Sequence, residues 1–148
     1  MNDLRELYQE VIIDHSKYPR HHYSMAHPSH RAQGYNPLCG DKLTVFVQVE
    51  KNCIQEISFL GCGCAISQAS ASLMTDAVMG LSLEAAHGLF KQFHQMLTHE
   101  EPGDHTHMDK LSILAGVRAF PARVKCATLA WHTLEAALAN DATTVVTE

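Results

Sequence analysis

Residues 43–60 constrain the fold most strongly, because apolar and polar side chains alternate there on both sides of a short turn. Leu43, Val45, Val47 and Val49 alternate with Thr44, Phe46, Gln48 and Glu50, which predicts a strand with one buried face. Lys51-Asn52 then predicts a hairpin turn into a second strand over residues 53–60. A hairpin of this kind must bury its apolar face against another layer of the protein.

Helical periodicity flanks the hairpin and supplies that layer. The first helix should end near Tyr18-Pro19, and residues 20–37, rich in His, Ser, Pro and Gly, predict a long irregular loop. Further helices are expected over 66–78, after the N-cap candidate Ser82, over 109–116, and from Pro121 onward. A third short strand would lie near residue 61 or in the loop before the hairpin. We therefore expect a two-layer α+β fold and a single domain, residues 1–148.

Composition limits the possible functions. The chain has 148 residues, of which 46% are hydrophobic and 18% charged, as in ordinary globular proteins. Its net charge of −5 argues against nucleic acid as a partner. No segment reaches the roughly 18 apolar residues of a membrane span, and the N-terminus lacks a signal-peptide core. We expect a cytoplasmic protein, in which five cysteines serve a purpose other than disulfides.

Four of the five cysteines lie where one predicted element gives way to the next. Cys39 precedes the first strand, Cys62 and Cys64 follow the second, and Cys126 lies near the start of the last helix. Helix N-termini and neighbouring cations such as Lys125 favour the reactive thiolate form. Cys53 lies inside a strand and is expected to be a small buried hydrophobe.

Three thiolates with the Asp41 carboxylate would suit tetrahedral zinc, and would suit a [2Fe–2S] cluster less well. An oxygen ligand among sulfurs indicates a position at which ligands exchange. Spacing alone leaves the chemistry open, because the sequence has no CxxC pair and the cysteines spread over nearly 90 residues. A structural zinc module that only binds partners, and a thiol hydrolase using Cys and His, are the alternatives.

Several motifs, in order along the chain, resemble one family. They are Asn36-Pro37-Leu38-Cys39-Gly40-Asp41, the segment from Phe59 to Ser67 with Gly61-Cys62-Gly63-Cys64 at its centre, and Phe120-Pro121-Ala122-Arg123-Val124-Lys125-Cys126-Ala127. Together they resemble the IscU/SufU scaffold family of iron–sulfur cluster assembly, which is NifU N-terminal-like, and most closely its SufU branch. The resemblance implies a three-stranded antiparallel sheet covered by helices, of the SufE/NifU-like kind.

The resemblance also implies a metal site. In the SufU branch the ligands would fall on Cys39, Asp41, Cys64 and Cys126, and the metal would be zinc, or iron in a transient [2Fe–2S] cluster. IscU-type members carry histidine where this chain has Lys125, which favours the SufU reading. IscU-type members also place the middle cysteine where Cys62 stands. Both thiols would reach one ion if the segment were extended, so Cys62 is the alternate to Cys64.

A cysteine desulfurase of the SufS kind is the implied partner, and downstream assembly or acceptor proteins would receive the product. We expect Cys39 to accept sulfur as a persulfide, with Cys126 as the alternate acceptor. The protein would then be either a scaffold or a zinc-dependent sulfur carrier. The insertion over residues 94–108, with His99, His105 and His107, fits the SufU branch and is expected to be a solvated loop.

Overall fold

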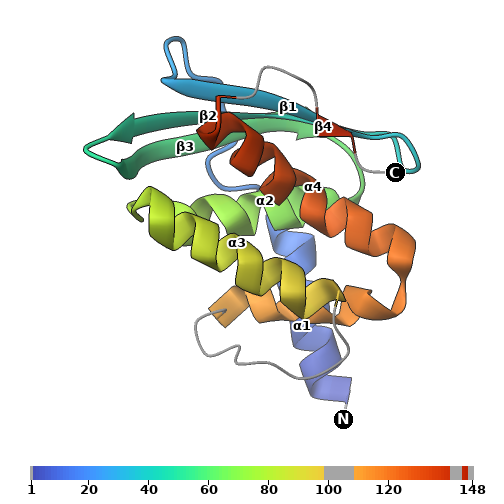
Figure 1. Cartoon of the computed structure of the whole chain (residues 1–148). Helices are drawn as coiled ribbons and strands as arrows, with labels where there is room; N and C mark the ends of the chain where they lie inside the picture. The colour runs from blue at the N-terminus through green and yellow to red at the C-terminus, as the bar shows by residue number, and fades with distance from the viewer. Residues whose placement is uncertain (1, 99–108, 141–144, 147–148) are drawn as a thin grey trace.

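The computed structural model describes residues 2–98, 109–140 and 145–146 of the chain. Its elements follow one another in an order that places a sheet early in the chain and most of the helices late (Figure 1). They are α1 (Asn2–Lys17), β1 (His30–Asn36), β2 (Asp41–Glu50), β3 (Cys53–Cys62), α2 (Ala65–Val78), α3 (Leu83–Thr98), the 3₁₀ helix η1 (Asp109–Ala119), α4 (Pro121–Leu138) and β4 (Val145–Val146).

The sheet has the strand order β3-β2-β1-β4. β1, β2 and β3 pair antiparallel, which confirms the expected three-stranded core, and the two-residue β4 adds a parallel pairing with β1 at Gly34. β1 lies inside residues 20–37, which were expected to be mainly an irregular loop, and it takes the second of the two places considered for the third strand. Its inner face carries Ala32, Gly34 and Asn36, all buried, so one small and one polar residue flank a glycine where a strand usually presents large apolar side chains.

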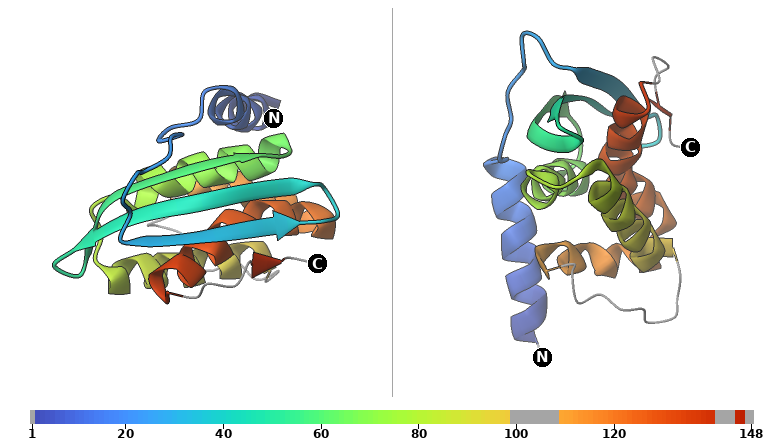
Figure 2. Two further views of the ribbon diagram at one scale, coloured as in Figure 1. Left: turned by 90° about the horizontal axis from the view of Figure 1, so that it is seen from above. Right: turned by 60° about the vertical axis from the view of Figure 1, so that its left-hand side comes forward.

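One face of the sheet is covered by helices, and these form the second layer (Figure 2). α4 packs on β1 and β2, while α2 packs on β3 and against α4. α3 and η1 contact α4, and α1 contacts α2. The centre of this layer holds Phe93 and Trp131, whose stacked ring centroids lie 4.5 Å apart with both side chains fully buried.

The predicted starts of α3 and α4 agree with the structure. The Ser82 hydroxyl accepts a hydrogen bond from the Ala85 N–H at 3.0 Å and so caps α3, and Pro121 is the first residue of α4. Gly80 follows α2 with a φ of +84°, a value that glycine adopts without strain. β3 runs to Cys62, further than expected, and η1 runs beyond residue 116 to Ala119.

Four segments meet at one end of the sheet. They are the turn between β1 and β2, the first residue of β2, the junction of β3 with α2, and the first turns of α4. None of the described helices combines the length and apolar character that a membrane span requires.

Candidate metal centre

Cys39, Asp41 and Cys126 form a compact group of potential metal ligands. One sulfur or oxygen atom from each lies within 4.8 Å of the others, and the sulfur atoms of Cys39 and Cys126 are 3.1 Å apart. The two cysteines are 87 residues apart in the sequence. The expected convergence of these side chains is therefore present in the fold.

Cys39 occupies the turn over residues 37–40 that joins β1 to β2, and its side chain is exposed. Gly40 has a φ of +72°, which allows the chain to reverse direction directly after the cysteine. Leu38, on the other side, is also exposed. The thiol is thus exposed to solvent on a short turn.

Asp41 is the first residue of β2, and it is fully buried. Its carboxylate accepts a hydrogen bond from the Cys64 backbone N–H at 2.8 Å and one from the Asn36 side-chain amide at 3.2 Å. Its side chain also lies against the backbone of Gly63, where a Cβ would overlap the carboxylate. A buried carboxylate needs such donors, because burial without them strongly disfavours its charged form.

Cys64 is the N-cap of α2 and adjoins the group. Its sulfur accepts a hydrogen bond from the Ser67 N–H at 3.4 Å and lies 4.0 Å from Oδ2 of Asp41. The Cys64 sulfur does not belong to the group of ligand atoms from Cys39, Asp41 and Cys126 that lie within 4.8 Å of one another. It therefore adjoins the group through Asp41 and would have to move closer to share an ion with the other three side chains.

Cys126 lies in the second turn of α4 and is fully buried. Burial raises the pKa of its thiol above the usual value, and contacts with Cys39, Cys64 and Asp41 raise it further. The expectation that the helix start and Lys125 would activate this thiol is therefore wrong. Lys125 instead lines a separate pocket of about 370 Å³ with His94 and His132, on another side of α4.

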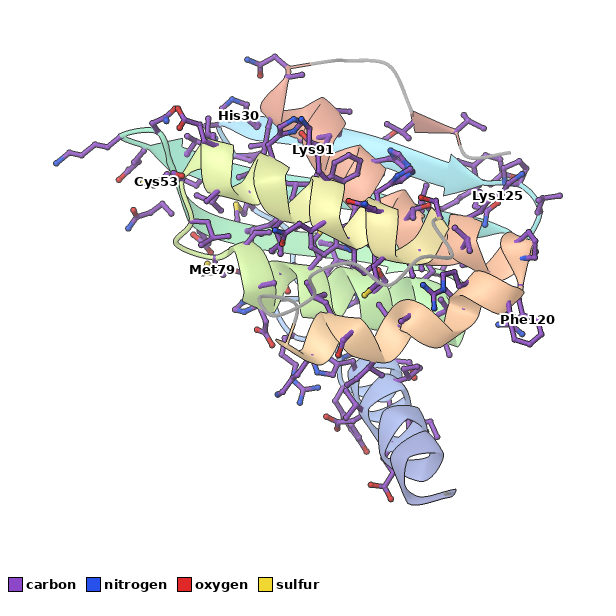
Figure 3. All side chains as sticks on the ribbon, turned by 60° about the horizontal axis from the view of Figure 1, so that its bottom comes forward. His30, Cys53, Met79, Lys91, Phe120 and Lys125 are labelled. Atoms are coloured by element: carbon purple, nitrogen blue, oxygen red, sulfur yellow. The ribbon has the colours of Figure 1, made fainter. Side chains whose placement is uncertain are left out.

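Cys62 and Cys53 lie away from the group. Cys62 pairs with Lys42 across the strands, and because Asp41 faces inward, Lys42 and Cys62 face outward. In an extended segment, Cys62 and Cys64 would face the same side. β3 ends at Cys62, however, and Cys64 already belongs to the start of α2, so the two thiols do not share a face. Cys53, only half-buried, lies at the opposite end of the molecule from Phe120 and Lys125 (Figure 3).

Asn36 is a site residue that reasoning from the sequence did not single out. It is the last residue of β1, pairs directly with Asp41, and is fully buried. Its side-chain amide donates to Asp41 and to the Cys126 sulfur, the latter at 3.5 Å. Its Oδ1 has no partner among the described residues, and a buried carbonyl left unpaired costs about 1–3 kcal/mol. The available signal was its place at the start of the motif Asn36-Pro37-Leu38-Cys39-Gly40-Asp41, close to two predicted ligands.

The chemistry of these side chains fits a tetrahedral zinc ion. Zinc binds thiolate sulfur at about 2.3 Å, so two sulfurs on one tetrahedral ion lie about 3.8 Å apart. A thiolate sulfur and a carboxylate oxygen on one such ion lie about 3.5 Å apart. The Cys39 and Cys126 sulfurs, at 3.1 Å, lie closer together than the first value, and the Cys64 sulfur and Asp41 Oδ2, at 4.0 Å, lie further apart than the second, so small side-chain adjustments would admit the ion. The histidines expected in a solvated loop, His99, His105 and His107, lie outside the described residues.

Comparison with known proteins gives consistent matches over most of the chain. Residues 7–127 match the family model of the NifU-like N terminal domain. The iron–sulfur cluster assembly scaffold protein IscU of Streptococcus pyogenes is 41% identical, over 96% of this chain and 89% of that protein. The zinc-dependent sulfurtransferase SufU of Bacillus subtilis is 38% identical, over 94% of each. A crystal structure from Fervidobacterium islandicum, described as a candidate iron–sulfur cluster assembly scaffold for the SUF system, has a TM-score of 0.84 at 32% identity, over 90% of this chain and 98% of that chain.

Proposed function

The chain belongs to the NifU-like N-terminal domain family, with relatives of the IscU and SufU type, and on this premise we propose that it carries sulfur for iron–sulfur cluster assembly. It binds zinc through Cys39, Asp41, Cys64 and Cys126 and accepts persulfide sulfur from a cysteine desulfurase. The observation that carries this proposal is the pairing of one exposed thiol, Cys39, with a buried thiol and a buried carboxylate within 4.8 Å. Cys39 is thus accessible, Cys64 is half-buried, and Asp41 and Cys126 are enclosed.

Sulfur transfer follows from this arrangement. The Cys39 thiolate attacks the terminal sulfur of the desulfurase persulfide, a new S–S bond forms on Cys39, and the S–S bond in the partner breaks. The partner leaves as a cysteine thiolate, so no net oxidation occurs and no further reactant is needed. Cys126 is the alternate acceptor only after a rearrangement, because its sulfur is fully buried.

Zinc is favoured over a resident cluster by the donor set. Clusters of the [2Fe–2S] type are held mainly by four cysteines, whereas zinc accepts sulfur and carboxylate oxygen together. The Bacillus subtilis relative is named a zinc-dependent sulfurtransferase, and the Streptococcus pyogenes relative a scaffold. Measuring zinc, iron and labile sulfide in freshly purified protein distinguishes the two roles. Stoichiometric iron and labile sulfide would show that the protein is a cluster scaffold and not a sulfur carrier.

The acceptor assignment is tested with a matched desulfurase and sulfur-35 cysteine. Cys39→Ala should abolish labelling of the chain, while Cys62→Ala, which removes an exposed thiol on the outer face of the sheet, should leave labelling unchanged. Full labelling of Cys39→Ala would refute the assignment. Labelling of no cysteine, together with unfolding on metal removal, would instead support a purely structural zinc module.

We expect this exchange in the cytoplasm, where thiols remain reduced, with delivery onward to downstream assembly or acceptor proteins.

A further inference from the structure

We infer that Asn36 is a positioning residue that keeps Asp41 and Cys126 on the metal, so that Cys39 alone is released to take sulfur. This inference rests on the proposed sulfur-carrier function. It concerns which ligand leaves, and it assigns that choice to a side chain outside the ligand set.

Asn36 is placed for this task by the register of the sheet. As the last residue of β1 it pairs with Asp41, the first residue of β2, so a short side chain suffices to reach the carboxylate. The same amide nitrogen lies 3.2 Å from Oδ2 of Asp41 and 3.5 Å from the sulfur of Cys126. One NH₂ group therefore connects two ligands that come from the sheet and from α4.

The remaining ligands differ in the donors they receive. Cys64 receives the Ser67 N–H, and Asp41 receives the Cys64 N–H as well as the amide of Asn36. Among the residues described, Cys39 receives no N–H donor, and its only polar contact is with the Cys126 thiol. Donors stabilise the charged, metal-binding form of a thiolate or carboxylate and fix its orientation. Cys39 is thus the ligand with the least support, and it is also the exposed one.

The orientation of the Asn36 amide indicates that this residue serves the ligands. Both of its neighbours are acceptors when they bind metal, so the NH₂ group faces them and Oδ1 is left without a partner among the described residues. An apolar side chain of similar size would satisfy the interior better. The two acceptors account for an asparagine at this position, whereas packing does not.

A double-mutant cycle separates this role from general support of the fold. Zinc affinity is measured by competition with a chromophoric chelator in four proteins: wild type, Asn36→Leu, Cys39→Ala and the double variant. If Asn36 secures the ligands that remain when Cys39 leaves, Asn36→Leu should lower the affinity about ten-fold more in the Cys39→Ala background than in wild type. Equal losses in the two backgrounds would overturn the inference.

Two further variants keep the test decisive. Gln33→Leu makes the same kind of change at an exposed position of β1, and it should have no effect in either background. If circular dichroism shows that Asn36→Leu does not fold, Asn36→Ser is used, since its hydroxyl can donate to one acceptor. A smaller background-dependent loss then supports the inference, and equal losses overturn it. Absence of zinc from the wild type would instead refute the proposed function.

Discussion

Replacing Gly63 with alanine should weaken metal binding without unfolding the protein. The added Cβ would lie 3.0 Å from both Cβ and Cγ of Asp41 and closer still to its Oδ1. Carbon atoms in ordinary contact are about 3.5–4.0 Å apart, so the carboxylate must retreat by about 0.5–1 Å. The backbone at Gly63 does not have a positive φ, so the effect comes from this overlap and not from strain.

The size of the effect follows from what holds Asp41. The carboxylate is fixed by the Cys64 N–H and the Asn36 amide, and a retreat of this size lengthens both hydrogen bonds. Each hydrogen bond to a charged group contributes about 1.5–3 kcal/mol. These bonds orient the carboxylate for the metal, and disturbing the groups that orient a metal ligand typically lowers metal affinity by about 10- to 100-fold.

Zinc affinity is measured by competition with a chromophoric chelator, and folding by circular dichroism and urea unfolding. Gly88→Ala is the matched control, because a Cβ there meets nothing within 4 Å. Gly88 lies within α3, where alanine should stabilise the helix by about 0.5–1 kcal/mol and leave the zinc affinity unchanged. A folded Gly63→Ala protein with wild-type affinity would show that Asp41 is not held at the metal as described.

Three other results are expected. Burial lowers the pKa of His15, whose ring is 2.7 Å from the Ser72 hydroxyl, so the unfolded chain binds a proton that the folded chain does not, and stability should fall as the pH drops below about 6.5. Urea unfolding across that range should show a smaller dependence on pH for His15→Gln. Phe93→Ala should cost about 3–5 kcal/mol in urea unfolding, because it removes the ring stacked on Trp131, and an unchanged midpoint would contradict the described core. Removing zinc with a chelator should lower the melting temperature, since the ion stabilises only the folded chain, and an equal value with and without zinc would exclude tight binding.

The hairpin and the helices could be predicted because each depends on local periodicity. Val45 and Val47 are fully buried as their alternation predicted, and the Ser82 and Pro121 signals marked real helix starts. A third strand was expected, but its place could not be fixed, because the inward face of β1 consists of Ala32, Gly34 and Asn36, which carry no strand signal. Gly34 is needed there because α4 packs so closely that a Cβ would overlap Thr133, a contact visible only in three dimensions.

The candidate site, too, could be predicted only in part from the sequence. The motifs located Cys39, Asp41 and Cys126, which the fold brings together. The side of the sheet on which Cys62 lies depended on its pairing with Lys42, and the burial of Cys126 depended on the packing of α4. Neither property has a local signature in the sequence, so the motifs could not show which way Cys62 faces or how deeply Cys126 is buried.

The arrangement of the ligands also has a consequence for newly made protein. A ribosome releases Cys39, Asp41 and Cys64 well before Cys126, which lies 87 residues after Cys39. A nascent or truncated chain therefore lacks the donor supplied by α4, and only a finished molecule offers the complete coordination sphere. Of the four proposed ligands Cys126 is thus the last to be synthesised, and a chain that ends before α4 would lack the thiol to which Cys39 and Asn36 make contact.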